Sequence, residues 1–218
     1  MSNDLDPKWL NVLSRKLSWA AIPNLAMVFV GLQMVGFFLT STDPEWIEKL
    51  ALIPEYVLRG EIWRVLTFLA LPVSQGIIGL LFGLMFGYFI LNSIEEEWGA
   101  TKTTIYVLSS IIITTLFSLV FGYPVLSVTG FVSTWFLAAA TLFPEQTIQI
   151  YFILPVKMKW LGLVAATFVL LEFARGEWID RFYLIAIYIN YLAFFGPSLV
   201  YRAQQWQRRR EFRNNWRK

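Results

Sequence analysis

Two long stretches without a charged residue constrain this chain more than any other feature of its sequence. No Lys, Arg, Asp or Glu occurs in residues 17–42, and none occurs in the forty-two residues 103–144. A transmembrane helix needs about 20 consecutive apolar residues. The first stretch therefore predicts one membrane span, and the second is long enough for two.

The composition of the whole chain also indicates a membrane protein. Of the 218 residues, 57% are hydrophobic and only 15% are charged, whereas soluble domains carry about 25% charged residues. The chain has no cysteine and no histidine. Disulfides are excluded, and we expect no metal site and no cofactor, because zinc sites are built largely from these two residue types.

Charge and chain breakers divide the chain into six predicted spans. The sequence Gly122-Tyr123-Pro124 breaks the second charge-free stretch, because proline cannot continue a helix. The predicted spans are residues 21–39, 76–92, 104–121, 126–143, 161–174 and 182–201. We therefore expect an all-α polytopic membrane protein with a lead-in over residues 1–18, a six-helix membrane domain over 19–201 and a basic tail over 202–218.

Between the first two spans, residues 41–75 combine eight charged residues with aromatic side chains such as Trp46, Tyr56 and Trp63. This mixture predicts an amphipathic segment that lies in the membrane interface.

Polar side chains inside the last two predicted spans are expected to find partners. The short fifth span carries Glu172, and Arg175 follows three residues later on the same helical face, so an ion pair is predicted. In the sixth span, Tyr188, Asn190 and Tyr191 are expected to form hydrogen bonds between helices.

The distribution of Lys and Arg orients the six spans. With an even number of spans, both termini lie on the same side of the membrane. That side holds thirteen Lys and Arg residues, and the opposite side holds five. Because cytosolic loops carry the excess of positive charge, both termini are predicted in the cytosol. Residues 1–18 are read as a cytosolic lead-in and not as a signal peptide.

The tail from residue 202 to residue 218 holds seven Lys and Arg residues and one Glu. The run Arg208-Arg209-Arg210 could suggest nucleic acid as a partner. After a membrane span, however, such a cluster holds the chain end in the cytosol and contacts anionic headgroups, at roughly 1 kcal/mol per basic residue. The predicted partner is the lipid bilayer and not nucleic acid.

The fourth predicted span and the segment after it resemble a known family. The chain reads Ser127-Val128-Thr129-Gly130, then Phe143-Pro144, then Leu154-Pro155-Val156-Lys157-Met158-Lys159-Trp160. These residues resemble the fourth helix and following loop of the rhomboid intramembrane serine proteases. There a Gly-x-Ser-Gly turn carries the nucleophile, a Phe-Pro ends the helix, and an Ile-Pro-Val-Lys-x-Lys-Trp run follows. The resemblance implies a six-transmembrane-helix rhomboid-like fold.

Other stretches carry the same resemblance. Trp63-Arg64, with Thr67 three residues later, is similar to the Trp-Arg motif between the first two spans, which active rhomboids share with their inactive relatives. Glu95 and Gly99 match the Glu and Gly that end the family's second span. A Trp-Arg pair at an interface also supplies an amphipathic anchor and five guanidinium donors for carbonyl or phosphate oxygens.

The residues that perform rhomboid chemistry are replaced. Thr129 stands at the position of the serine nucleophile, and Asn190 stands at the position of the catalytic histidine. Gly79 and Gly83 fall where active rhomboids have the His and Asn of the oxyanion site. Asn cannot act as a general base, and a hydroxyl needs an adjacent base to become a nucleophile. The resemblance is therefore to an inactive rhomboid, or pseudoprotease, similar to derlins.

Gly79, Gly83 and Gly87 are spaced by four residues and line one face of the second span. Such a stripe lets another helix approach closely. Tight packing within one subunit is the preferred interpretation, and dimerisation or a groove for a foreign transmembrane helix remain alternatives.

Three functions are compatible with this pattern. The first is an inactive rhomboid-like protein that binds transmembrane segments of client proteins for chaperoning, trafficking or delivery for degradation. An intramembrane protease with an unorthodox Thr129 centre is the second. The third is a structural subunit that forms a homo-oligomer through its glycine stripe.

Overall fold

The chain is mostly helical (79%) in the computed structural model, which describes residues 7–150 and 154–215. Four helical segments are long and apolar enough to cross a membrane. They are Ser18–Thr42, which contains α2 (Leu25–Thr42), α6 (Ile77–Trp98), α7 (Ala100–Phe121) and the part Trp178–Tyr201 of α10 (Trp178–Asn215). The first, second, third and sixth predicted spans are confirmed as such helices.

The two remaining predicted spans coincide with helices that are shorter or more charged than a typical transmembrane helix. Helix α8 (Thr129–Leu142) has 14 residues, so it is about 21 Å long against a hydrocarbon core of about 30 Å. Helix α9 (Met158–Arg175) has 18 residues but contains Lys159, Glu172 and Arg175. That these two helices also span the membrane stays a prediction.

Glycine residues in the left-handed region close two helix ends. Gly99 (φ 85°) separates α6 from α7, and Gly122 (φ 66°) ends α7. Both backbone conformations favour glycine because a side chain would clash there. Pro124 follows and prevents the helix from restarting at once, so the break predicted at Gly122-Tyr123-Pro124 is confirmed.

Helix α10 continues far beyond the predicted end of the sixth span. Its 38 residues contain Pro197 and run from Trp178 to Asn215, a length of about 57 Å. The predicted tail over 202–218 is therefore not a separate segment up to residue 215, because its backbone prolongs the last span as one helix. Residues 216–218 lie outside the described residues.

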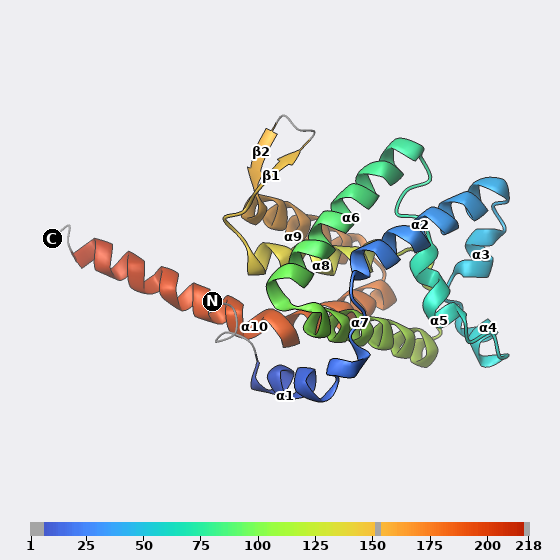
Figure 1. The fold of residues 1–218 in the computed structure, drawn as a ribbon, viewed down its shortest axis with the longest axis horizontal. Helices are drawn as coiled ribbons and strands as arrows, with labels where there is room; N and C mark the ends of the chain where they lie inside the picture. Colours follow the sequence, from blue (N-terminus) through green and yellow to red (C-terminus); the bar gives the residue numbers. More distant parts are fainter. Residues whose placement is uncertain (1–6, 151–153, 216–218) are drawn as a thin grey trace.

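The N-terminal helix and the tail lie toward the same end of the bundle. Helix α1 (Lys8–Lys16) packs beneath α7 and α10, and Trp9 meets Phe194 of α10 edge to face with ring centroids 4.9 Å apart. Figure 1 shows the C-terminal end of α10 pointing away from the short helices α3 to α5. Any even number of spans, four as well as six, gives this arrangement. That the shared end faces the cytosol stays a prediction.

Short helices form the segment between α2 and α6. They are α3 (Trp46–Leu50), α4 (Pro54–Leu58), α5 (Arg64–Thr67) and the 3₁₀ turn η2 (Phe68–Ala70). A further 3₁₀ turn, η1 (Ser18–Ala20), precedes α2. Large apolar side chains are exposed on this segment, namely Leu58, Ile62, Trp63 and Leu66. The segment is amphipathic, as the sequence predicts, and its exposed apolar side suits the membrane interface.

A small sheet corrects the all-α prediction. Strands β1 (Thr147–Ile150) and β2 (Leu154–Lys157) pair antiparallel, with Thr147 opposite Lys157. The resemblance indicates only a loop after the fourth helix here, and residues 151–153 of this segment lie outside the described residues. Glu145 joins the base of this hairpin to α9, because its carboxylate oxygens lie 2.8 Å from the Nζ atoms of Lys157 and Lys159.

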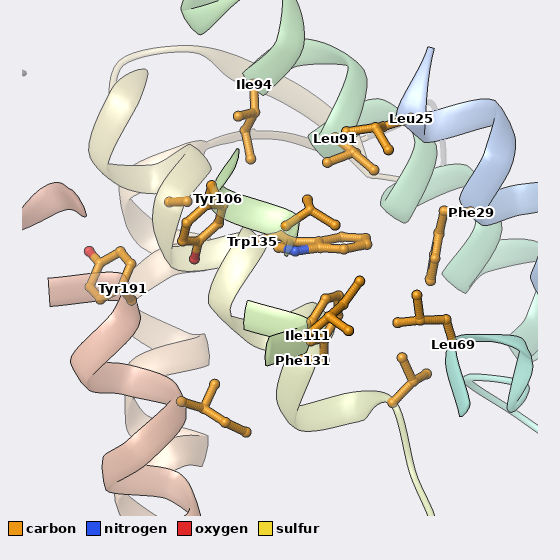
Figure 2. Packing of buried hydrophobic residues seen from close by; sticks show 14 of the residues in the cluster. Leu25, Phe29, Leu69, Leu91, Ile94, Tyr106, Ile111, Phe131, Trp135 and Tyr191 are labelled. Carbon is orange, nitrogen blue, oxygen red and sulfur yellow. The ribbon is translucent and has the colours of Figure 1, made fainter. Parts of the chain in front are cut away.

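The core surrounds α8, which packs against α6, α9 and α10. Figure 2 shows Trp135 of α8 between side chains from several helices. Trp135 is 2% exposed and meets Phe29 and Phe131 edge to face, with centroids 4.9 and 5.2 Å away. These aromatic contacts combine large buried area with favourable ring geometry.

One buried amide connects α2 to the chain that leads into α6. Gln33 is fully buried, and its Nε2 donates to the carbonyls of Leu69 (2.6 Å) and Leu71 (2.8 Å). Its Oε1 accepts from the amide of Val73 at 2.9 Å. One turn further along α2, Gly36 lies directly against the carbonyl of Ala70.

The two glycines of α2 provide a matched test of this close approach. A Cβ at Gly36 would overlap the Ala70 carbonyl, whereas a Cβ at Gly31 meets nothing within 4 Å. We expect Gly36→Ala to destabilise the protein by about 1–3 kcal/mol, as overpacking does. Gly31→Ala should be neutral or slightly stabilising, because alanine favours a helix over glycine. Thermal unfolding of both variants in detergent would contradict this if their midpoints were equal.

The two ion pairs of Glu145 with Lys157 and Lys159, here called the hairpin clip, predict that the stability of the fold depends on pH. Hydrogen bonds from Lys157 and Lys159 lower the pKa of the Glu145 carboxyl from 4.5 to about 2. A depressed pKa means that the clip stabilises the fold above pH 4.5 and loses its effect as the pH falls toward 2. Carbon-13 carboxyl shifts should show Glu145 titrating near 2 in the wild type and closer to 4.5 in a Lys157→Gln/Lys159→Gln variant. Titration near 4.5 in both proteins would exclude the clip.

Candidate functional site

A cavity of about 850 Å³ lies at the head of α8. It is bounded by the α7–α8 connection, the first turn of α8, the C-terminal half of α9 and the start of α10. Its lining combines apolar, hydroxyl and charged side chains: Tyr123, Pro124, Val125, Leu126, Ser127, Thr129, Phe168, Leu171, Glu172, Arg175, Asp180, Tyr183 and Leu184, with Gly130 and Gly176. This volume is within the range of small-molecule sites.

The cavity is open along α9. Only Met158 and Gly162 of this helix are buried, and both lie near its N-terminal end. There Gly162 packs closely against Ala140 of α8. Phe168 and Leu171, which line the cavity further along the helix, are 66% and 44% exposed. Two walls of the site are therefore held in the core, whereas the α9 wall carries exposed apolar side chains.

Thr129 lies on the cavity wall as the first residue of α8 and is exposed. Its Oγ1 is 2.8 Å from the Oγ of Ser127, and that Oγ accepts a hydrogen bond from the Thr129 amide at 3.1 Å. The Ser127 hydroxyl thus serves one of the amides that a helix start leaves without a partner. Gly130 faces α10, and a Cβ there would make ordinary van der Waals contacts with Ile187 and Tyr183 at 3.6 and 3.9 Å.

Asn190 lies away from the Thr129 hydroxyl and is bound to α7. Its Nδ2 donates to Ser110 Oγ at 2.7 Å, and its Oδ1 accepts from Ser109 Oγ at 3.1 Å. The side chain is buried. In the described part of the chain, no hydrogen bond joins Thr129 to Asn190, so the structure does not bring the two positions together as a dyad.

Tyrosine hydroxyls connect α8 to α10. Tyr188 and Ser133 are 2.7 Å apart, and Tyr191 and Thr141 are 2.6 Å apart. Together with Asn190, these bonds confirm the predicted hydrogen bonding between helices by the polar residues of the last span. They hold the cavity's α8 and α10 walls together.

The glycine stripe of α6 packs against residues of the same chain. Gly79 lies against Ser74, Gly83 against Val73, and a Cβ at Gly87 would be 3.0 Å from the ring of Phe29. This packing agrees with the preferred interpretation of the stripe.

Arg64 organises the interfacial segment. Its guanidinium is buried and donates through Nη1 to the carbonyls of Glu48 and Ala51 and through Nε to Glu61. It also lies over the ring of Tyr56, 4.6 Å from the centroid. The neighbouring Trp63 is 56% exposed. The motif therefore divides its roles: Arg64 satisfies backbone carbonyls, and Trp63 faces outward as an anchor.

Glu95 caps a different helix. Its two carboxylate oxygens accept hydrogen bonds from the amides of Asn24 (2.8 Å) and Leu25 (3.1 Å) at the start of α2. Asn24 itself has a φ of 58°, a left-handed conformation that asparagine tolerates better than most residues. Glu95 thus ties the end of α6 to the beginning of α2.

At the rim of the cavity, Asp180 forms hydrogen bonds that were not predicted from the sequence. Asp180 accepts from the hydroxyl of Tyr123 at 2.9 Å and from the amide of Glu177 at 3.0 Å. Burial, followed by this hydrogen bond to Asp180, raises the pKa of Tyr123 to about 12. The predicted ion pair between Glu172 and Arg175 is absent among the described residues; both side chains line the cavity instead.

The hydrogen bonds of Arg64 predict a large loss of folding stability when its side chain is truncated to alanine. Arg64→Ala leaves two carbonyls and the Glu61 carboxylate without their donor, and removing one partner of a buried ion pair costs about 3 kcal/mol or more. The matched control is Arg59→Ala, since Arg59 is exposed and only covers the Tyr56 ring at 5.8 Å. Thermal unfolding should show a much lower midpoint for the first variant, and equal midpoints would refute the assigned role.

Comparison with known proteins places the chain in a family. A family model described as eukaryotic integral membrane protein, DUF1751, matches residues 24–196. The match begins just before α2, ends within α10 and includes every residue of the cavity. This family is rhomboid-like. The curated proteins and the solved structures gave no match. Because the match covers most of the 218 residues, the chain belongs to the eukaryotic integral membrane protein family DUF1751.

Proposed function

We propose that this protein is a catalytically inactive rhomboid-like membrane protein that binds transmembrane segments of client proteins. The binding site is the cavity between α8, α9 and α10. The observation that carries the proposal is the cavity itself: an apolar, laterally exposed α9 wall stands opposite a polar head formed by Ser127 and Thr129. The consequence for a client is chaperoning, trafficking or delivery for degradation.

The two sides of the cavity suit different parts of a client helix. Phe168 and Leu171 offer apolar surface along the helix, as lipid does. The hydroxyls of Ser127 and Thr129 offer hydrogen bonds to backbone groups or polar side chains near the helix end. In hydrocarbon an unsatisfied polar group costs several kcal/mol. A client segment with a polar or partly unwound outer turn therefore gains more from this site than from lipid.

Inactivity is supported by the residues at the family's catalytic positions. The chain has no histidine, and Asn190 is engaged with Ser109 and Ser110 on α7. The Thr129 hydroxyl is paired with Ser127, which cannot act as a base. Proteolysis by a Thr129 centre is the alternative, and the experiment below also detects peptide cleavage.

Photocrosslinking in liposomes tests the proposal. A photoreactive amino acid is placed at Leu126 or Leu171 in the cavity, and at Met34 of α2 as a control, because Met34 is 57% exposed but outside the cavity. The probes are two synthetic transmembrane helices, one all-leucine and one with Gly and Ser in its outermost turn. We expect several-fold more crosslinking of the polar-ended helix at Leu126 and Leu171 than at Met34.

Two outcomes contradict the proposal. Equal crosslinking at all three positions would mean that the peptides sample the lipid-facing surface without a site. Cleaved peptide would show proteolysis instead, and cleavage at the proposed Thr129 centre should disappear in Thr129→Val.

A further inference from the structure

Glu172 and Arg175 carry opposite charges and have a sequence spacing that often gives an ion pair on a helix, yet they form none. They lie three residues apart on α9, a spacing at which side chains meet on one face. Both line the cavity, and among the described residues neither side chain has a hydrogen bond or an ion pair.

Two neighbouring charged residues, Asp180 and Arg181, differ because their side chains form hydrogen bonds within the fold. Asp180 accepts hydrogen bonds from Tyr123 and from the amide of Glu177. Arg181 donates to the carbonyls of Phe173 and Ala174. Of the charged residues that line the cavity, Glu172 and Arg175 are therefore the two whose side chains form no hydrogen bond or ion pair in the part of the chain that the structure describes.

The position of the pair indicates headgroup depth in the membrane. Arg175 is the last residue of α9, and Trp178, which opens α10 just beyond it, is 75% exposed. Exposed tryptophan is enriched at the level of lipid headgroups. Below the pair, Phe168 and Leu171 continue the cavity as exposed apolar surface.

From these observations we infer that Glu172 and Arg175 bind the headgroup of a zwitterionic phospholipid. The Arg175 guanidinium binds the phosphate, for which its planar donors are suited. The Glu172 carboxylate binds the ammonium group of ethanolamine or choline. The partial negative charge at the C-terminal end of α9 also favours a cation there. The acyl chains lie along Phe168 and Leu171.

The charges favour a zwitterionic headgroup over an anionic one. The phosphate of an anionic lipid would also bind Arg175. Such a headgroup has no ammonium group to pair with Glu172, so its negative charge would lie beside the Glu172 carboxylate. The inference does not rest on client binding, because it concerns the charged turn of α9 in the absence of any peptide.

Native mass spectrometry of the purified protein tests this site. The probes are phosphatidylcholine, phosphatidylethanolamine and phosphatidylglycerol with identical acyl chains. We expect the two zwitterionic lipids to bind roughly tenfold more tightly than phosphatidylglycerol. Glu172→Gln should abolish this preference, and Arg175→Gln should weaken the binding of all three lipids.

Matched controls separate a site from general charge effects. Glu177→Gln and Arg59→Gln make the same charge changes at exposed residues that do not line the cavity, and both should behave as wild type. Equal binding of the three lipids to the wild type, or equal effects of cavity and control variants, would mean annular lipid only. Loss of peptide crosslinking with the lipid preference intact would instead overturn only the client-binding proposal.

Discussion

Hydrogen bonds from buried or capping side chains to backbone groups are the interactions on which this structure depends. Gln33, Arg64 and Glu95 each serve amides or carbonyls that no regular helix satisfies. Groups buried in the membrane, such as those that Gln33 serves, cannot turn to water, so each unsatisfied one is expensive. Gln33 fixes α2 to the chain before α6, Glu95 fixes the other end of α2 to α6, and Arg64 folds the interfacial segment. The α2–α6 frame is thereby determined at both ends.

This frame explains why the cavity has two firm walls and one open wall. Helix α8 is held from one side by Trp135 against Phe29 of α2 and from the other by hydroxyl pairs to Tyr188 and Tyr191 of α10. Helix α9 is joined to α10 only near its C-terminal end, where Arg181 donates to the carbonyls of Phe173 and Ala174, in the described part of the chain. Near its other end, Gly162 lets α9 approach α8. Its second half, with Phe168 and Leu171, is left as exposed apolar surface beside the polar head of α8.

The parts of the fold that the sequence predicts are those decided by local chemistry. Charge-free stretches mark the long spans, and Gly122 with Pro124 marks a break, because both signals act within a few residues. The hairpin at Thr147–Ile150 and Leu154–Lys157 is not predicted, since strands of four residues carry too little periodicity to be recognised. The role of Gln33 is also missed, because its partners lie 36 to 40 residues away. At the site, the positions of Thr129 and Gly130 on the cavity wall follow from the motif, but the unpaired Glu172 and Arg175 do not.

The residues that hold the scaffold are different from those at the degenerate catalytic positions, and this separation has a physical consequence. Arg64 and Glu95 act on backbone groups, so their substitution costs folding energy whatever the protein does. Thr129 contributes its pairing with Ser127 at an exposed helix start, and Asn190 contributes two hydrogen bonds to Ser109 and Ser110 of α7. Under the proposal of an inactive rhomboid-like protein, the loss of nucleophile and base therefore costs the fold little. The proposed binding of a membrane-embedded ligand would require only the cavity and its polar head, without any chemistry.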